Sequence, residues 1–378
     1  MSLHHEPHPL SSALIGWYDL NARDLPWRRS PSPYHVWLSE IMLQQTRVEA
    51  VKGYYRRFLD ALPDISSLAH ADEDTCMKLW EGLGYYSRVR NLHKAAKQIM
   101  EEYGGIMPSS YTELLNIAGI GPYTAAAIAS IVFGEVIPAI DGNLLRVFAR
   151  LSSYPESIKE AAAKKAAHAF FLECMPKDRP GDFNQALMDL GATICLPNGK
   201  PLCSSCPLSG FCRSFCENRT ADFPLVPAKK ARSIEKRTVF LIHDSGKIAI
   251  KKRPKRGLLA GLYEFPNCEE HLDEDAVIRY SKSLGFSPIR IKKLGFAKHV
   301  FTHKEWDMIG YDILTDALEP YPSSSHSVEA LKIAESSGQA LSPLFTKEES
   351  PILLVHLKDI REYYSIPSAF KKFKEYLD

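Results

Sequence analysis

Four cysteines in one short stretch constrain this chain more than any other feature. They follow the pattern C-x7-C-x2-C-x5-C, and they are Cys195, Cys203, Cys206 and Cys212. Thiolates brought together by short loops bind either a zinc ion or a [4Fe-4S] cluster, and ligand type does not decide between the two. A zinc ribbon usually pairs two C-x2-C knuckles, whereas this stretch has one. The stretch is therefore expected to fold around a bound metal group, with zinc and iron–sulfur both open on spacing alone.

This interpretation requires reduced cysteines. Residues 1–12 contain neither the basic nor the apolar segment of a secretion signal. The best candidate for a membrane span, 125–140, is interrupted by Glu135 and Pro138. We therefore expect a cytoplasmic protein without a membrane partner, in which the 8 cysteines stay reduced.

The first part of the chain, up to residue 219, predicts helices separated by Gly and Pro residues. One helix has apolar residues at helical spacing from Tyr34 onward, and Glu40 lies on its polar face. Ser157 and Glu160 are expected to form a capping box that opens an alanine-rich helix. This part is expected to be nearly all α.

The remainder of the chain changes character. Residues 220–236 lose helical periodicity and gain prolines and basic residues, which predicts a linker. Residues 237–378 begin with a hairpin pattern around Asp244-Ser245-Gly246. This part is expected to be α+β, with further strands and a closing helix at 289–291, 308–313 and 369–377.

Charge and glycine placement point to nucleic acid. The net charge of +2 conceals a basic stretch, because residues 229–256 contain 11 Lys or Arg and 2 acids. Gly119-Ile120-Gly121 separates two predicted helices and would direct backbone N–H groups at a phosphate, although a plain helix connection is the alternative.

Two acids could carry chemistry, but each also has an ordinary explanation. Asp141 stands where a helix N-cap stands. Glu40, on a polar helix face, is by default a solvated carboxylate. They become a catalytic pair only if the fold brings them together.

Five segments occur in the order found in the MutY-type adenine DNA glycosylases, a family of the helix-hairpin-helix superfamily that also contains endonuclease III. They are LSEIMLQQT at 38–46, GLGYYSR at 82–88, GIGPYT at 119–124, DGN at 141–143 and the cysteine cluster. A sixth, GLLAGLYEFP at 257–266, resembles the Nudix-like C-terminal domain of that family. The resemblance implies a two-part fold: an all-α helix-hairpin-helix glycosylase domain with an iron–sulfur cluster loop at 1–219, and an α+β Nudix-like domain at 237–378.

By this resemblance, Glu40 and Asp141 face each other across a pocket for an adenine flipped out of double-stranded DNA. Cleaving an N-glycosidic bond builds positive charge on the sugar while the departing base needs a proton, so two acids are required. Glu40, its pKa raised by burial, would protonate adenine at N7 and later activate water, and ionised Asp141 would stabilise the sugar cation. Tyr123 would assist within hydrogen-bonding reach.

Relatives that also cut the DNA backbone carry a Schiff-base lysine where this chain has Tyr123. The resemblance thus implies a monofunctional glycosylase of base excision repair, acting on adenine paired with 8-oxoguanine or guanine. One alternative is an endonuclease III-like pyrimidine glycosylase and lyase, against which Tyr123 and the C-terminal domain argue. Another is a non-catalytic iron–sulfur DNA-binding protein, against which the presence of both Glu40 and Asp141 argues.

The same resemblance assigns contacts with DNA. Gln45 and Tyr85 wedge into the duplex, and a loop at 301–303 reads 8-oxoguanine, with Thr302 where the family has serine. Trp27, Arg28 and Gln185 complete the adenine pocket. The full set of residues assigned to DNA or base contacts is Trp27, Arg28, Gln45, Tyr85, Gly119, Gly121, Gln185, Phe301, Thr302 and His303.

The resemblance also selects the cofactor, a [4Fe-4S] cluster on the four cysteines. The family usually has six residues in the first gap and this chain has seven, which adds little closure entropy. Cys216 is a candidate substitute ligand. The Arg-Glu-x-x-Glu-Glu box of Nudix hydrolases is absent from the sequence, so nucleotide hydrolysis is not expected. We expect a monomer that acts on DNA in the nucleoid.

Overall fold

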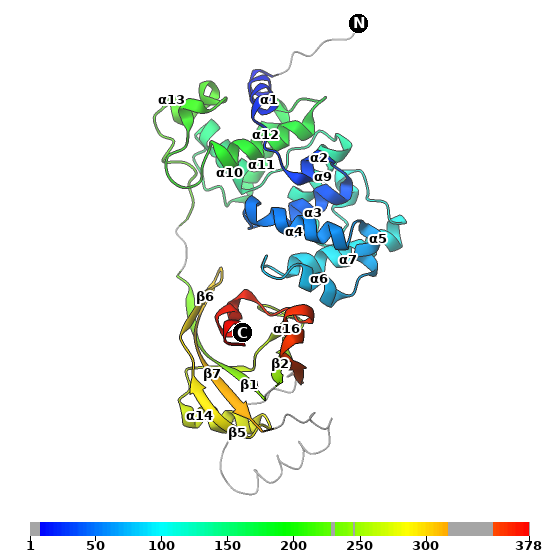
Figure 1. Ribbon diagram of the computed structural model, residues 1–378. Coiled ribbons are helices and arrows are strands. Elements are labelled where there is room, and N and C mark those ends of the chain that lie inside the picture. Colours follow the sequence, from blue (N-terminus) through cyan, green and yellow to red (C-terminus); the bar gives the residue numbers. More distant parts are fainter. Residues whose placement is uncertain (1–7, 228–230, 245, 317–350, 378) are drawn as a thin grey trace. The chain divides into compact units, whose positions relative to one another are not determined.

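The computed structural model describes residues 8–227, 231–244, 246–316 and 351–377 (Figure 1). Its chain forms two compact units. Unit 1 comprises residues 1–76 and 88–229, and unit 2 comprises residues 77–87 and 230–378.

The first part of the chain is helical, as the sequence predicts. Several helices begin with a proline in their first turn, where the missing N–H would have no intrahelical partner. Among the described helices, none is long and apolar enough to cross a membrane. The helices are α1 (Pro9–Asn21), α2 (Pro26–Arg29), α3 (Pro33–Leu43), α4 (Val48–Ala61), α5 (Ile65–His70), α6 (Glu73–Leu79), α7 (Ser87–Tyr103), α8 (Tyr111–Leu114), α9 (Pro122–Phe133), α10 (Gly142–Ser152), α11 (Ala161–Cys174), α12 (Pro180–Thr193) and α13 (Arg213–Cys216), with the 3-10 turns η1 (Cys203–Ser205) and η2 (Ser209–Phe211).

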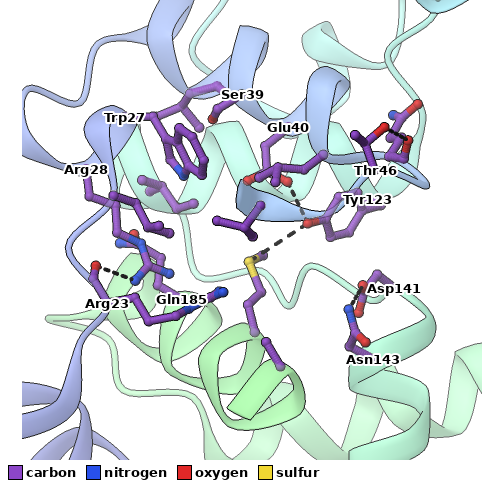
Figure 2. Close-up of a pocket in the computed structure, with 18 of the residues that line it drawn as sticks. Arg23, Trp27, Arg28, Ser39, Glu40, Thr46, Tyr123, Asp141, Asn143 and Gln185 are labelled. Atoms are coloured by element: carbon purple, nitrogen blue, oxygen red, sulfur yellow. Dashed lines mark hydrogen bonds between the residues drawn. The ribbon is translucent and has the colours of Figure 1, made fainter. Parts of the chain in front are cut away.

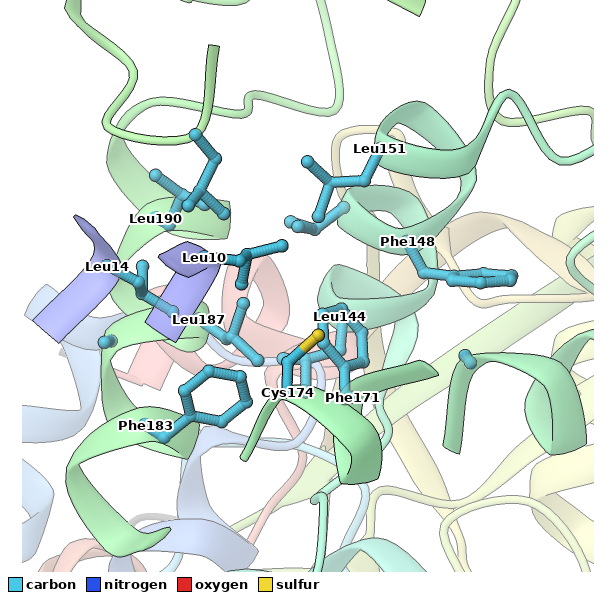
Figure 3. Packing of buried hydrophobic residues seen from close by; sticks show 14 of the residues in the cluster. Leu10, Leu14, Leu144, Phe148, Leu151, Phe171, Cys174, Phe183, Leu187 and Leu190 are labelled. Carbon is cyan, nitrogen blue, oxygen red and sulfur yellow. The ribbon is translucent and has the colours of Figure 1, made fainter. Parts of the chain in front are cut away.

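A large apolar cluster holds α1, α10, α11 and α12 together (Figure 3). Helix α12 also packs closely on α9: a Cβ added at Gly181 would lie 2.7 Å from Cα of Ile131. Only glycine fits this approach, which fixes the wall that α12 presents to the rest of unit 1. The labelled members of the cluster are Leu10, Leu14, Leu144, Phe148, Leu151, Phe171, Cys174, Phe183, Leu187 and Leu190.

The capping box expected at Ser157 and Glu160 is wrong. Helix α11 begins after Glu160, and its N-cap makes no side-chain hydrogen bond. Ser157 instead accepts a hydrogen bond from the backbone N–H of Lys159 at 3.2 Å. The spacing of the motif is present, but the Ser157 hydroxyl accepts its hydrogen bond within the turn that precedes the helix and does not cap the helix.

Unit 2 contains a mixed sheet with the strand order β3-β2-β1-β7-β5. Strand β1 pairs parallel with β7, and the predicted hairpin joins β1 to β2 antiparallel. In addition, β4 pairs with β1, β6 with β7 and β8 with β2. The strands are β1 (Ser233–His243), β2 (Lys247–Lys252), β3 (Tyr263–Glu264), β4 (Asn267–Glu269), β5 (Pro288–Lys293), β6 (Ala297–Val300), β7 (Lys304–Thr315) and β8 (Ile352–His356).

Both faces of this sheet are buried, because side chains alternate along each strand. On β1, Val239 and Leu241 join the cluster that contains Phe370 and Phe373, whereas Phe240 and Ile242 join the cluster that contains Val277. Helix α14 therefore covers one face and the C-terminal helices cover the other, which confirms the α+β expectation. These elements are α14 (Glu274–Ser283), α16 (Leu357–Tyr363), η3 (Ser368–Phe370), α17 (Lys371–Lys374) and η4 (Glu375–Leu377).

Candidate active site

A cavity of about 810 Å³ lies in unit 1, and Figure 2 shows its principal side chains. Its walls come from α2, α3, α9, α12 and the start of α10. The residues predicted from sequence that line it are Trp27, Arg28, Glu40, Gln45, Tyr123, Asp141 and Gln185. Sequence reasoning did not select several other lining residues, among them Tyr18, Ser39, Asn143, Arg146 and Met188.

Glu40 is buried on α3, with 5% of its surface exposed. The Tyr123 hydroxyl donates a hydrogen bond to Glu40 Oε2 at 2.5 Å. Burial raises the pKa of Glu40 to about 7; the Tyr123 hydrogen bond opposes this, nearby Asp141 adds to it and Arg28 opposes it. The sequence placed Glu40 on a polar helix face, and the structure corrects this: the face is turned to the cavity and not to solvent.

Tyr123 lies one residue inside the start of α9. Burial and the charge of Glu40 raise its pKa well above the ordinary value for tyrosine, so it remains a neutral hydrogen-bond donor at physiological pH. Its hydroxyl is also 3.8 Å from the sulfur of Met188 on α12. Helix α12 presents Gln185, Met188 and Ala192 to the cavity at helical spacing.

Asp141 is both an N-cap and a cavity residue. Its Oδ1 accepts a hydrogen bond from the backbone N–H of Leu144, and its Oδ2 accepts one from Asn143 Nδ2, each at 2.8 Å. Burial raises its pKa, while these donors and Arg146 act to lower it. Both interpretations of Asp141 are therefore compatible, because the cap fixes the carboxylate where it lines the cavity.

The predicted turn at 119–121 connects α8 to α9. Gly119 has a φ of 75°, and a Cβ there would lie 2.6 Å from Cβ of Asn91, so the position requires glycine. Gly121 is the N-cap of α9. Both glycines are exposed while Ile120 between them is buried, so the turn presents backbone to solvent.

Two other predicted DNA contacts have a strained backbone. Gln45 and Tyr85 have φ values of 59° and 48°, in the left-handed region that non-glycine residues rarely adopt. Gln45 lines the cavity, whereas Tyr85 is half exposed and lies outside it. Such strain is typical of functional positions.

Residues 38–171 match the family described as HhH-GPD superfamily base excision DNA repair protein, and residues 238–375 match the NUDIX domain. The chain is 38% identical over 354 residues to the adenine DNA glycosylase of Arabidopsis thaliana, which covers 79% of this chain and 56% of that protein. It is 34% identical over 372 residues to the adenine DNA glycosylase of Mus musculus, which covers 83% of this chain and 72% of that protein. The chain belongs to the adenine DNA glycosylase family.

A solved structure supports the fold of the helical part. A thermostable thymine-DNA glycosylase aligns with a TM-score of 0.50 and 28% identity, covering 55% of this chain and 95% of that one. The two family matches and the adenine DNA glycosylase relatives confirm the resemblance seen in the sequence motifs. The two family matches also confirm the two-part fold. The matched region spans just over half the length of the Arabidopsis relative.

In this adenine DNA glycosylase family member, the four clustered cysteines line one small cavity of about 30 Å³ beside α10. Arg150 donates to Cys195 Sγ at 3.2 Å, and Cys212 Sγ donates to the Arg150 carbonyl at 3.4 Å. Cys216 is exposed and lies outside this cavity. The donor set therefore fits a group held by four thiolates, and Cys216 is not part of it.

The loop at 301–303 is the turn between β6 and β7. The Phe301 backbone N–H donates to the Lys304 carbonyl at 2.8 Å, and the Phe301 ring packs edge-on against Trp306. Thr302 and His303 are exposed. The Thr302 hydroxyl lies 2.9 Å from that of Tyr85, which belongs to the same compact unit.

We expect Glu40→Gln to stabilise the protein at pH 8 and to do so less at pH 5.5. The folded-state pKa of about 7 exceeds the ordinary 4.5, so the wild type loses stability as pH rises between these values. Glutamine has no proton to lose and still accepts the Tyr123 hydrogen bond. The gain at pH 8 should be on the order of 3 kcal/mol in chemical unfolding.

The matched control is Glu49→Gln at an exposed site on α4, which should change the unfolding free energy by less than about 0.5 kcal/mol. If Glu40→Gln changed the unfolding free energy equally at the two pH values, Glu40 would not titrate as described.

Proposed function

We propose that this chain excises adenine paired with 8-oxoguanine or guanine in double-stranded DNA, as a monofunctional glycosylase. The observation that carries the proposal is the Glu40 carboxyl, buried in a cavity that Asp141 also lines, with a pKa of about 7. Relatives named adenine DNA glycosylases support the choice of base. We further propose that the enzyme acts as a monomer on nucleoid DNA.

Glu40 supplies the proton. With a pKa of about 7, a large fraction of it is protonated at neutral pH, as a general acid requires. It donates to N7 of the flipped adenine, and the electrons of the C1′–N9 bond leave with the base. Glu40, now a carboxylate, accepts a proton from the water that adds to C1′, which restores the starting state.

Asp141 stabilises the positive sugar. The backbone N–H of Leu144 and the side-chain amide of Asn143 hold its carboxylate in place, so no reorganisation is needed as the positive charge develops. This fixed charge explains why the N-cap of α10 is an aspartate and not a serine, since both would cap the helix equally well.

Strand cleavage is not part of the activity. The residue at the position of the lyase lysine is Tyr123, which has no amine to form a Schiff base and whose raised pKa keeps its hydroxyl protonated. Among the described residues that line the cavity there is no lysine. Base removal therefore leaves an intact abasic strand.

Recognition of the opposite base belongs to unit 2. We assign it to the turn at 301–303, because Thr302 and His303 expose polar groups there. The Phe301 ring anchors this turn by packing against buried Trp306. The wedge role of Gln45 and Tyr85 accords with their strained backbone.

A [4Fe-4S] cluster is the cofactor that we propose for the four cysteines. The four thiols line one shared cavity, as a group held by four thiolates requires. The family resemblance supports iron–sulfur over zinc as the group held there. The cluster, when bound, would hold the loop after α12 in one conformation.

Asp141→Asn should lower the single-turnover rate of adenine release from an A:8-oxoguanine duplex by about 100-fold or more, because the stabilising charge is removed while the cap is kept. The measurement is gel-resolved abasic-site formation after alkali treatment. The matched control is Asp64→Asn, the N-cap of α5 away from the cavity, which should stay within about twofold of wild type.

The same assay separates the alternatives. Wild-type protein that releases no adenine, or an Asp141→Asn rate equal to wild type, contradicts the mechanism. Strand cleavage without alkali, together with borohydride trapping of protein on DNA, would identify a lyase.

At limiting enzyme, A:8-oxoguanine duplexes should react faster than A:G duplexes, and Thr302→Ala and His303→Ala should each reduce this rate ratio by about tenfold. Tenfold corresponds to the free energy of one lost hydrogen bond. The rate on A:G should change little. Ser283→Ala, an exposed hydroxyl elsewhere in unit 2, serves as the control. An unchanged preference in both variants would remove the turn from lesion recognition.

Purified protein should contain about four iron atoms per chain and absorb visible light. Cys206→Ser should lose iron, because a cavity thiolate is removed, whereas Cys216→Ser should retain it. Stoichiometric zinc in wild type, or equal iron loss in the two variants, would contradict the assignment.

A further inference from the structure

A buried carboxylate stands behind the cavity wall, outside every motif that the sequence singled out. Asp189 on α12 has no exposed side-chain surface. Its Oδ2 and Oδ1 accept hydrogen bonds from the two terminal nitrogens of Arg28 at 2.7 and 2.9 Å. Arg23 adds its Nε, at 2.7 Å from Oδ1, and its backbone N–H, at 3.1 Å from Oδ2. One carboxylate thus holds two guanidinium groups.

This arrangement keeps Asp189 ionised. Burial alone would raise its pKa, but the hydrogen bonds and charges of Arg28 and Arg23 outweigh that effect and lower it. Arg28 has one further hydrogen bond among the described residues, from its Nη1 to the Arg23 carbonyl at 3.3 Å (Figure 2).

Arg28 and Glu40 line the same cavity, and the charge of Arg28 acts to lower the pKa of Glu40. Among the described residues, the hydrogen-bond partners of Arg28 are Asp189 and Arg23, and Glu40 is not one of them. An arginine free to turn in a desolvated cavity would pair with the nearest carboxylate and hold it ionised. The carboxylates of Glu40 and Asp189 could therefore both pair with the Arg28 guanidinium, and in the structure Asp189 is the one bonded to it.

We propose that Asp189 is a positioning residue that holds Arg28 away from Glu40, so that Glu40 can carry the proton delivered to the base. The inference rests on the role proposed for Glu40. Asp189 itself lies behind Arg28 and does not touch the reacting atoms.

The groups that act on the ionisation of Glu40 come from three elements: Arg28 of α2, Tyr123 of α9 and Asp141 at the start of α10. Val48 of α4 and Met188 of α12 also line the cavity, and neither side chain titrates. The other titratable groups that line the cavity are Tyr18, Arg23, Arg146 and Asp182.

The test is the pH profile of single-turnover adenine release. The wild-type rate should fall as pH rises through about 7, where Glu40 loses its proton. Asp189→Asn, which frees Arg28 at constant side-chain size, should move that fall to lower pH by about one unit or more. Its deficit should therefore be large at pH 8 and small at pH 5.5, with duplex affinity unchanged.

Arg28→Gln supplies the opposite arm and keeps the proposal testable if Asp189→Asn does not fold. Removing the positive charge should move the fall in rate to higher pH, and Asp189→Asn combined with Arg28→Gln should lose the downward shift. The control is Asp19→Asn, which breaks an Asp–Arg fork of the same kind with Arg179 at an exposed site. Its profile should match wild type.

Each failure has its own signature. A purely structural clamp would lower the rate of Asp189→Asn equally at all pH values, and an unshifted profile in either Asp189→Asn or Arg28→Gln overturns the proposal. Wild-type protein that releases no adenine overturns the proposed function instead.

Discussion

A carboxyl group buried without a cation bonded to it is the constraint on which unit 1 depends. Among the described residues, the Tyr123 hydroxyl donates a hydrogen bond to Glu40 and the charge of Arg28 acts in the same direction, but burial outweighs both, so the ionised form is disfavoured. A site of this kind lowers stability, and the remainder of the unit must supply what is lost. The apolar cluster around α1, α10, α11 and α12 does so directly behind the cavity.

Helix α12 shows how the cavity and its support share one element. Phe183, Leu187 and Leu190 belong to the apolar cluster, whereas Gln185 and Met188 line the cavity. Asp189, between these faces, joins the helix to Arg28 of α2 and to Arg23 in the segment before α2. A helix with three separate environments cannot show a simple amphipathic pattern.

The sequence predicted the secondary structure of both parts well, because helical spacing and the 244–246 turn are local signals. Periodicity failed at Glu40, since a polar residue that faces a cavity has the same spacing as one that faces solvent. The Arg28–Asp189 pair, separated by 161 positions, leaves no local pattern at all. Family resemblance supplied seven of the residues that line the cavity but not the carboxylate behind it.

The Tyr123 hydrogen bond also makes the two oxygens of Glu40 inequivalent. Because Oε2 accepts the hydrogen bond from the tyrosine, we expect the proton of the neutral acid on Oε1. In the mechanism proposed for Glu40, proton delivery then has one origin and one direction. That mechanism requires a base whose acceptor nitrogen lies at Oε1, which would give the cavity regiochemical selectivity before any contact with the exocyclic groups of the base.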